Sequence, residues 1–129
     1  MQSNSQEDML TRSTLEAIQR LNDAVNRHDV EAVMAAMTED CVFENTYPPP
    51  DGERYEGHAA VQAFWARFFG SSPHAAFEAE ETLGCGDRCV VRWLYRWVGA
   101  DGKAGHIRGV DVFRVRAGKV AEKLSYVKG

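Results

Sequence analysis

One carboxylate, Asp111, lies in the middle of a strand-like run near the C-terminal end of the chain. Side chains alternate between the two faces of a strand, so Asp111 shares its side with an apolar set. The members of that set are Ile107, Gly109, Phe113 and Val115. Asp111 is therefore the only ionisable group that we expect on this face. Desolvation disfavours the charged form of such a carboxylate unless a donor or a cation compensates. The pattern favours a general acid/base, and a core carboxylate satisfied by a buried Tyr, Trp or backbone donor is the alternative.

Asn45 is the second candidate for a catalytic role. Its amide could donate a hydrogen bond to a substrate carbonyl or to Asp111, although it could equally cap the turn into the proline-rich loop of residues 47–52. Tyr47, at the start of that loop, offers a hydroxyl at the predicted pocket mouth. We predict no metal site: Cys85 and Cys89 lack the further Cys or His residues of a zinc set, and neither G-x-S-x-G nor H-E-x-x-H occurs.

Aromatic residues are the candidates for the wall of a substrate pocket. They combine a large apolar body with, in Tyr and Trp, a polar tip. Core packing is the common alternative for such residues. The substrate-binding candidates are Phe43, Tyr47, Trp65, Trp93, Tyr95 and Phe113.

Composition restricts the class of protein. At 129 residues the chain predicts a single domain with a real core. The net charge of −4, without a dense Lys/Arg cluster, argues against a nucleic-acid partner, and no apolar run is long enough for a membrane span. The first ten residues lack the pattern of a signal peptide, and three cysteines suggest reduced thiols. We therefore expect a cytoplasmic protein that needs no cofactor.

The N-terminal half reads as helical. Residues 1–12 are predicted to be a flexible N-terminus, and Ser13 and Glu16 form a capping box that begins a helix running to about His28. Asp29 can cap a second, shorter helix. After a short strand near residues 40–45 and the proline-rich loop, a third helix follows Gly57, with Gly70 suited to its C-terminal cap. The domain is predicted to span residues 13–129.

From residue 75 onward the hydrophobic period becomes two. We predict four strands, at about 75–83, 88–98, 105–116 and 119–127, joined by hairpin turns into an antiparallel meander. The inner face is rich in aromatic residues. The outer face sets Glu78 and Glu80 against Arg92, Arg96 and Arg108 on neighbouring strands and is half apolar. That composition favours a homodimer through the sheet.

The chain from about Thr14 to Lys128 resembles the nuclear transport factor 2-like superfamily, and within it the SnoaL-like branch. The resemblance lies in Asn26-Arg-His-Asp29, Met37-Thr-Glu-Asp-Cys-Val-Phe-Glu44, Tyr55-Glu-Gly-His-Ala-Ala-Val-Gln-Ala-Phe-Trp65 and, above all, Gly109-Val-Asp-Val-Phe-Arg-Val-Arg-Ala-Gly-Lys-Val120. It implies an α+β, cone-shaped, cystatin-like fold in which three N-terminal helices pack on a curved, mostly antiparallel sheet.

The resemblance also suggests which chemistry to expect. Asp111 matches the protonated aspartate of ketosteroid isomerases, but Leu21 and Asn45 stand where that family has its tyrosine and its base. Limonene epoxide hydrolases are similar in fold, yet Arg92-Trp93-Leu94 and Ser125 depart from their Asp-Arg-Asp set. SnoaL-type polyketide cyclases, which rely mainly on one acid in an apolar cavity, resemble this chain better.

Together these patterns predict a protein that binds a small apolar or aromatic molecule in a cone-shaped pocket. It would act as a cofactor-independent isomerase, cyclase or dehydratase that uses Asp111 on a cyclic or aromatic carbonyl compound. The alternative is a non-catalytic ligand-binding or structural dimerisation module.

Overall fold

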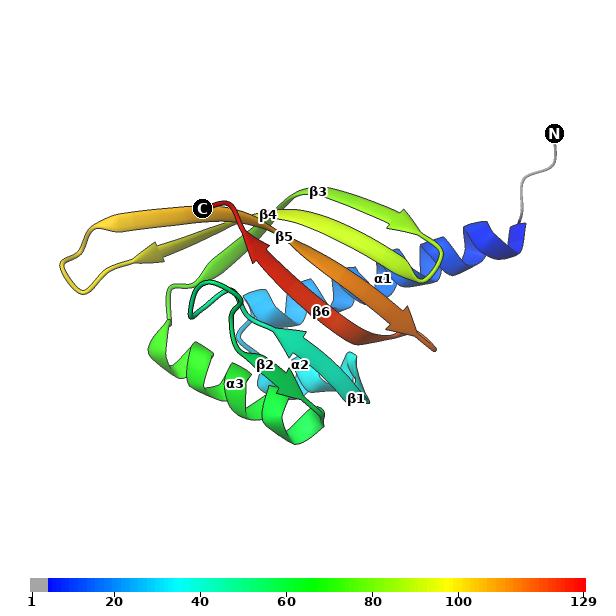
Figure 1. Ribbon diagram of the computed structural model, residues 1–129, viewed down its shortest axis with the longest axis horizontal. Coiled ribbons are helices and arrows are strands. Elements are labelled where there is room, and N and C mark those ends of the chain that lie inside the picture. Colours follow the sequence, from blue (N-terminus) through cyan, green and yellow to red (C-terminus); the bar gives the residue numbers. More distant parts are fainter. Residues whose placement is uncertain (1–4) are drawn as a thin grey trace.

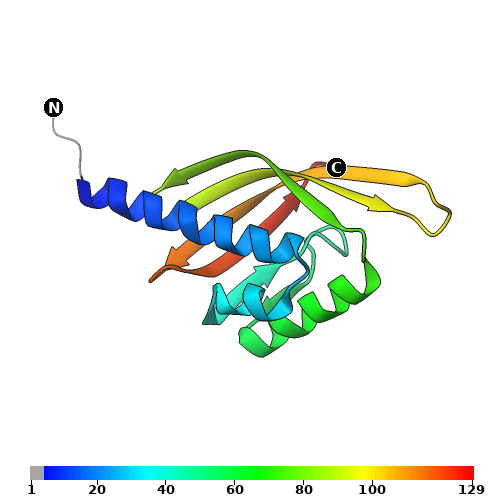
Figure 2. The same cartoon turned by 180° about the vertical axis from the view of Figure 1, so that it is seen from behind.

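The computed structural model describes residues 5–129 and shows three helices on one side of a curved six-stranded sheet (Figures 1 and 2). The helices are α1 (Ser5–Asn26), α2 (Val30–Ala35) and α3 (His58–Ser71). The strands are β1 (Met37–Glu44), β2 (Arg54–Glu56), β3 (Ala76–Cys85), β4 (Arg88–Val98), β5 (Ala104–Arg116) and β6 (Lys119–Val127). This arrangement confirms the predicted cone-shaped α+β fold.

Helix α1 begins at Ser5, so the predicted helix start at Ser13 is wrong. Residues 5–12 of the expected flexible N-terminus belong to this helix, and residues 1–4 lie outside the described residues. The longer helix is anchored by the turn between β3 and β4. Thr11 Oγ1 accepts a hydrogen bond from the backbone N–H of Gly86 (2.8 Å), and Thr14 Oγ1 donates one to the carbonyl of Gly86 (2.6 Å). These contacts are distant in sequence, so local patterning does not reveal them.

The second helix begins as predicted, because Asp29 Oδ1 accepts a hydrogen bond from the backbone N–H of Ala32 at 3.0 Å. Helix α3 follows Gly57, whose φ of 90° suits glycine. The predicted cap at Gly70 is wrong. The helix continues through Ser71, and the chain leaves it at Ser72, whose carbonyl accepts from Ala75 N.

The sheet has the order β2-β1-β6-β5-β4-β3. The four-strand meander from β3 to β6 is confirmed, with antiparallel pairing throughout. Two features were not predicted: the short edge strand β2, and the parallel pairing of β1 with β6, which sets Phe43 beside Lys123. Alternation within a strand shows which side chains share a face, but it does not identify a partner strand from the other end of the chain.

The outer face carries the predicted cross-strand ion pairs. Glu78 pairs with Arg96 at 3.0 Å and Glu80 with Arg108 at 2.9 Å. A register shift between Ala79 and Glu81 adds a third pair, Glu81 with Arg92, at 2.9 Å. The helices cover the other face of the sheet, so this charged face does not contact them (Figures 1 and 2).

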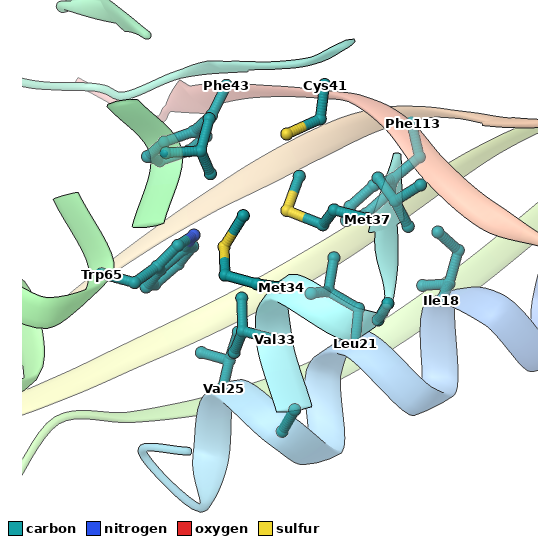
Figure 3. Close-up of a cluster of buried hydrophobic side chains, with 14 of the residues drawn as sticks. Ile18, Leu21, Val25, Val33, Met34, Met37, Cys41, Phe43, Trp65 and Phe113 are labelled. Atoms are coloured by element: carbon teal, nitrogen blue, oxygen red, sulfur yellow. The ribbon is translucent and has the colours of Figure 1, made fainter. Parts of the chain in front are cut away.

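The core lies between the helices and the inner face of the sheet (Figure 3). It joins Ile18, Leu21 and Val25 of α1, Val33 and Met34 of α2, Met37, Cys41 and Phe43 at β1, Trp65 of α3 and Phe113 of β5. Phe113 is completely buried here. Close packing of this kind holds the centre of β5 and the C-terminal half of β6 in position. These two segments carry the candidate functional site.

Candidate functional site

A cavity of about 390 Å³ lies between α1 and the inner face of the sheet. We call it the α1 cavity. Its floor includes Ala79, Val91, Trp93 and Asp111, and α1 provides both apolar and amide-bearing side chains. The full lining is Leu15, Ile18, Gln19, Asn22, Asp23, Val25, Asn26, Trp65, Phe77, Ala79, Thr82, Val91, Trp93, Asp111 and Lys123. A volume of this size is within the range of small-molecule sites.

At one edge of the α1 cavity, Asn26 at the end of α1 is hydrogen-bonded to β3. Its amide nitrogen donates to the carbonyl of Phe77, and its amide oxygen accepts from the N–H of Phe77, both at 2.9 Å. The side chain thus pairs with the backbone of β3 as a neighbouring strand would. This double hydrogen bond holds the helix against the sheet where the cavity wall passes from one to the other.

A second hollow, of about 180 Å³, lies beneath the proline-rich loop. We call it the loop cavity. It is lined by Phe43, Asn45, Thr46, Tyr47, Phe64, Trp65, Phe68, Phe77, Trp93, Tyr95, Ile107, Lys123 and Ser125. Trp65, Phe77, Trp93 and Lys123 belong to both linings. These four side chains therefore form the partition between the two cavities.

Asp111 is buried, as predicted, but it is not alone on its face. The register of β5 and β6 sets Asp111 opposite Ser125 and Phe113 opposite Lys123, so all four side chains point inward. Lys123 Nζ lies 3.0 Å from Asp111 Oδ2, and Ser125 Oγ donates to Asp111 Oδ1 at 2.5 Å. The expectation of a single ionisable group on the inner face is wrong.

Lys123 is the centre of this network. Its ammonium also donates to Ser125 Oγ at 3.2 Å and lies 4.8 Å from the ring centre of Phe43 and 5.7 Å from that of Trp65. Such distances allow cation–π attraction. An ammonium has three N–H donors, and Asp111 and Ser125 occupy two of them.

Neither candidate for a second catalytic group lies beside Asp111 in the α1 cavity. Asn45 and Tyr47 line the loop cavity. The backbone N–H of Asn45 bonds to Glu53 O at 2.9 Å, which closes the proline-rich loop. Tyr47 is largely exposed at that loop. The hydrogen bonds of Asp111 go instead to β6, which the sequence interpretation did not include.

The aromatic candidates divide between cavity and core. Phe43, Trp65, Trp93 and Tyr95 line the loop cavity, and the two tryptophans also line the α1 cavity. Burial raises the pKa of the Tyr95 hydroxyl, which keeps it a neutral donor. Phe113 lines neither cavity and packs in the core.

Two buried donors of the wall have no protein partner. The indole Nε1 atoms of Trp65 and Trp93 are inaccessible, and no hydrogen-bond acceptor among residues 5–129 reaches them. Figure 3 shows the indole of Trp65 projecting from α3 into the interior. Buried N–H groups are rarely left unpaired, so these two call for a physical explanation.

Sequence reasoning missed Lys123 and Ser125. Antiparallel register counted from the Ala117-Gly118 turn would have paired them with Val112 and Val110 on the outer face. The register shift between Arg114 and Val115 instead sets them opposite Phe113 and Asp111 on the inner face. Tyr126, whose direction was open, is about half exposed and points outward.

The thiols take no part in the site. Burial raises the pKa of Cys41 and of Cys89 to about 11, while Cys85 is exposed. Within the described residues, His, Cys, Asp and Glu side chains form no group of three that could hold a metal ion. In the same range, no helix is both long and apolar enough to cross a membrane.

Comparison with known sequences and structures places the chain in a family. The sequence model of the SnoaL-like domain matches residues 18–123, which include α2, α3, Asp111 and Lys123. This protein belongs to the SnoaL-like family. No functionally curated protein matches the SnoaL-like chain at a significant level.

Solved structures agree with that assignment. An NTF2-like protein of unknown function from Mesorhizobium loti is 39% identical, with 92% of this chain and 93% of that one covered and a TM-score of 0.77. A putative polyketide cyclase from Xanthomonas campestris pv. campestris is 21% identical over 92% and 93% of the chains, with a TM-score of 0.75. TerC, co-crystallised with polyporic acid, is 21% identical over 90% and 92%, with a TM-score of 0.77. The last two share the fold of this SnoaL-like protein.

Proposed function

We propose that the protein binds a small cyclic or aromatic carbonyl compound in the α1 cavity and carries out cofactor-independent acid–base chemistry on it. One observation carries the proposal. The carboxylate of Asp111 is only 6% exposed, yet it forms part of the wall of a cavity large enough for a bicyclic molecule. Ionisable groups held in such a position are candidates for proton transfer.

The reaction that fits begins with removal of a proton from the carbon next to a carbonyl. Asp111 accepts that proton, the C–H electron pair forms a carbon–carbon double bond, and the carbonyl π pair moves to oxygen to give an enolate. The ammonium of Lys123, 3.0 Å from Asp111, would stabilise this negative charge on a substrate bound next to the pair. Asn45 and Tyr47 could donate to a substrate that extends into the loop cavity.

The fate of the enolate decides which reaction results. Return of the proton to another carbon gives an isomer, loss of a β-hydroxyl as water gives a dehydrated product, and attack on a second carbonyl carbon closes a ring. All three need the same first step from Asp111. The similarity in fold to a putative polyketide cyclase and to a protein co-crystallised with polyporic acid supports a cyclic substrate.

Exchange of the α-protons of 1-indanone in D₂O tests the first step without knowledge of the natural substrate. We expect the protein to accelerate exchange over buffer, and Asp111→Asn to lower the acceleration by about a hundredfold or more, the range for a positioned base. Asp23→Asn, at an exposed site on the same cavity, is the matched control. Equal exchange rates for Asp111→Asn and the unchanged protein would exclude Asp111 as the base.

A non-catalytic binding module is the second candidate, and one observation favours it. Both carboxylate oxygens of Asp111 already have partners, Lys123 and Ser125. Such a network can be purely structural. A protein that binds 1-indanone in the cavity but leaves its exchange rate at the buffer value would support this candidate and contradict the catalytic one.

A further inference from the structure

The side of α1 that faces the sheet carries an amide, Asn22, among aliphatic residues. Residues three and four apart lie on the same face of a helix, so Asn22 lies between Ile18 and Val25. These two neighbours are 1% and 5% exposed and belong to the core. Asn22 itself is half-buried and lines the α1 cavity. The helix thus presents a polar side chain to the cavity at a position where packing alone would favour an aliphatic one.

No interaction within the protein accounts for this amide. Among residues 5–129, no group is hydrogen-bonded to the side chain of Asn22. The residue lies four positions before the end of α1 at Asn26, so it caps neither end of the helix. Asparagine is also a weak helix former, because its side chain competes with the backbone for hydrogen bonds. The fold therefore has no evident use for an asparagine at this position.

The other two amides of the cavity lining are occupied. Asn26 pairs through both amide atoms with the backbone of Phe77, at 2.9 Å, and Gln19 donates to Asp23 Oδ1 at 2.9 Å. Asn22 keeps both its donor and its acceptor.

These atoms can also be reached by a ligand. Among the described residues, the side-chain polar atoms that are both buried and unpaired are the indole nitrogens of Trp65 and Trp93. The unpaired amide atoms of Asn22 are therefore open to solvent, and a guest in the cavity can bond to them in place of water.

Charge and hydrogen-bonding capacity indicate which group of a guest fits there. An amide offers an NH₂ donor and a carbonyl acceptor, and a hydroxyl group can pair with both. An anionic group is disfavoured, because Asp23 lines the same cavity and Lys123 is neutralised by Asp111 at 3.0 Å. Asn22 belongs to the helix wall and Asp111 to the sheet wall. The two side chains therefore contact a guest at different positions of its skeleton.

We propose that Asn22 is a specificity-determining residue whose amide binds a hydroxyl group of the ligand. The ligand is then a cyclic or aromatic carbonyl compound with a hydroxyl substituent, its carbonyl next to Asp111 at the sheet and its hydroxyl at α1. The inference rests on the proposed function and deepens it by naming a second functional group of the substrate. A few placed polar groups in an otherwise apolar cavity orient a ligand in this way.

The compounds for the test are 1-indanone and its 4-, 5- and 6-hydroxy derivatives, which share one bicyclic ketone and differ in a single phenolic group. Calorimetry or ligand-observed NMR measures their affinities. We expect the best-placed hydroxy derivative to bind about two- to tenfold more tightly than 1-indanone, the effect of a net hydrogen bond. If no hydroxy derivative binds more tightly than 1-indanone, hydroxyl recognition is wrong, while binding of the ketone in the cavity stands.

Asn22→Leu removes the amide at nearly constant size. Thr82→Val is the matched control, because it removes a hydroxyl from the β3 side of the same cavity. The informative quantity is the ratio of hydroxyindanone to indanone affinity within one variant, since a change in cavity shape affects both ligands. We expect this ratio to fall to one in Asn22→Leu and to persist in Thr82→Val. A ratio that persists in Asn22→Leu, or that falls equally in both variants, would overturn the inference.

Stability separates a ligand-binding role of Asn22 from a structural one. Leucine at this position would continue the apolar stripe of Ile18 and Val25, so we expect Asn22→Leu to unfold at a higher urea concentration than the unchanged protein. A lower midpoint would show that the fold itself uses the amide, and would count against the proposal.

The side-chain amide signals of Asn22 and Asn26 in ¹⁵N–¹H spectra measure the contact directly. Asn26 lines the same cavity, but its amide is engaged by Phe77, so its signals report only that a ligand is near. We expect the best-binding hydroxyindanone to shift the Asn22 signals more than 1-indanone does, and both compounds to shift those of Asn26 equally. Equal shifts of Asn22 would contradict the proposal. Failure of all four compounds to bind the unchanged protein would instead refute the proposed function, and with it the inference.

Discussion

Lys123 Nζ lies 3.0 Å from Asp111 Oδ2, and less than a tenth of either side chain is exposed to solvent. The two residues come from neighbouring strands, and both point into the space enclosed by the helices. A buried pair of this kind is weak evidence for stability, because desolvation offsets much of the attraction. Both residues line the α1 cavity, where the proposed function gives the pair a role toward a ligand.

Removal of one member of this pair should be more harmful than removal of both. Lys123→Met leaves the carboxylate of Asp111 buried without its cation, and we expect a loss of about 3–5 kcal/mol in the free energy of unfolding. The double variant Asp111→Asn/Lys123→Met carries no buried charge and should recover a large part of that loss. Urea denaturation of the four members of the cycle measures both quantities.

The exposed pair of Arg92 and Glu81 on the outer face provides the comparison for this cycle. Arg92→Met should change the free energy of unfolding by no more than about 1 kcal/mol, the usual range for a solvated pair. If Lys123→Met lowers the free energy of unfolding no more than Arg92→Met does, water or another group must compensate the buried carboxylate of Asp111. The ion pair with Lys123 would then not be what compensates that charge.

The sequence predicted the parts of the fold that depend on local pattern. Hydrophobic alternation and turn residues gave the meander from β3 to β6, because both signals lie within each hairpin. The parallel pairing of β1 with β6 and the early start of α1 depend on partners far along the chain. Thr11, for example, bonds to Gly86, and nothing near Thr11 in the sequence indicates that contact.

The same difference between local patterns and distant contacts explains which residues of the candidate site could be predicted from the sequence. Asp111 could be found from one strand, since alternation alone places it among apolar residues. Lys123 needs the register between two strands, and a register shift next to the Ala117-Gly118 turn alters that register. The missing partner changes the picture of the site, because the predicted lone acid is a carboxylate in contact with a cation.

Gly109 determines where Trp93 lies. A Cβ atom at Gly109 would lie 2.5 Å from Trp93 Cζ2 and 2.2 Å from the carbonyl oxygen of Tyr126. Gly109→Ala must therefore displace both the indole and a strand backbone, and we expect a loss of about 1–3 kcal/mol in the free energy of unfolding. The tryptophan emission of the folded variant should also change. Thermal and urea unfolding, together with fluorescence spectra, measure these effects.

Gly70→Ala is the control for that variant. Gly70 lies in α3, and an added Cβ would meet no atom within 4 Å. Alanine favours the helix, so we expect this change to stabilise the protein by up to about 1 kcal/mol. If the Gly109→Ala protein is as stable as the unchanged chain, the sheet and Trp93 can move at a small cost in free energy. The cavity wall would then be less rigid than the structure indicates.

The three thiols should differ in reactivity. Thiolate is the nucleophilic form, and a pKa of about 11 leaves Cys41 and Cys89 almost entirely protonated at pH 8. We expect iodoacetamide to modify only the exposed Cys85 of the folded protein, and all three cysteines in urea. Raising the pH toward 11 should increase the reactivity of the two buried thiols, because their thiolate fraction rises. Mass spectrometry counts the adducts, and rapid modification of Cys89 at pH 8 would show that β4 opens readily.

The outer face of the sheet is the surface on which we expect two copies to associate. Val90, Val110 and Val112 are partly exposed there, between the ion pairs of Glu78, Glu80 and Glu81. In a twofold dimer each residue of this face meets the same face of the partner, so one substitution introduces two charges. Val112→Lys should therefore give particles with the mass of one chain in light scattering at micromolar concentration, whereas the unchanged protein gives twice that mass. Met9→Lys, on exposed α1 away from this face, should remain dimeric. A single-chain mass for the unchanged protein would refute association through the sheet.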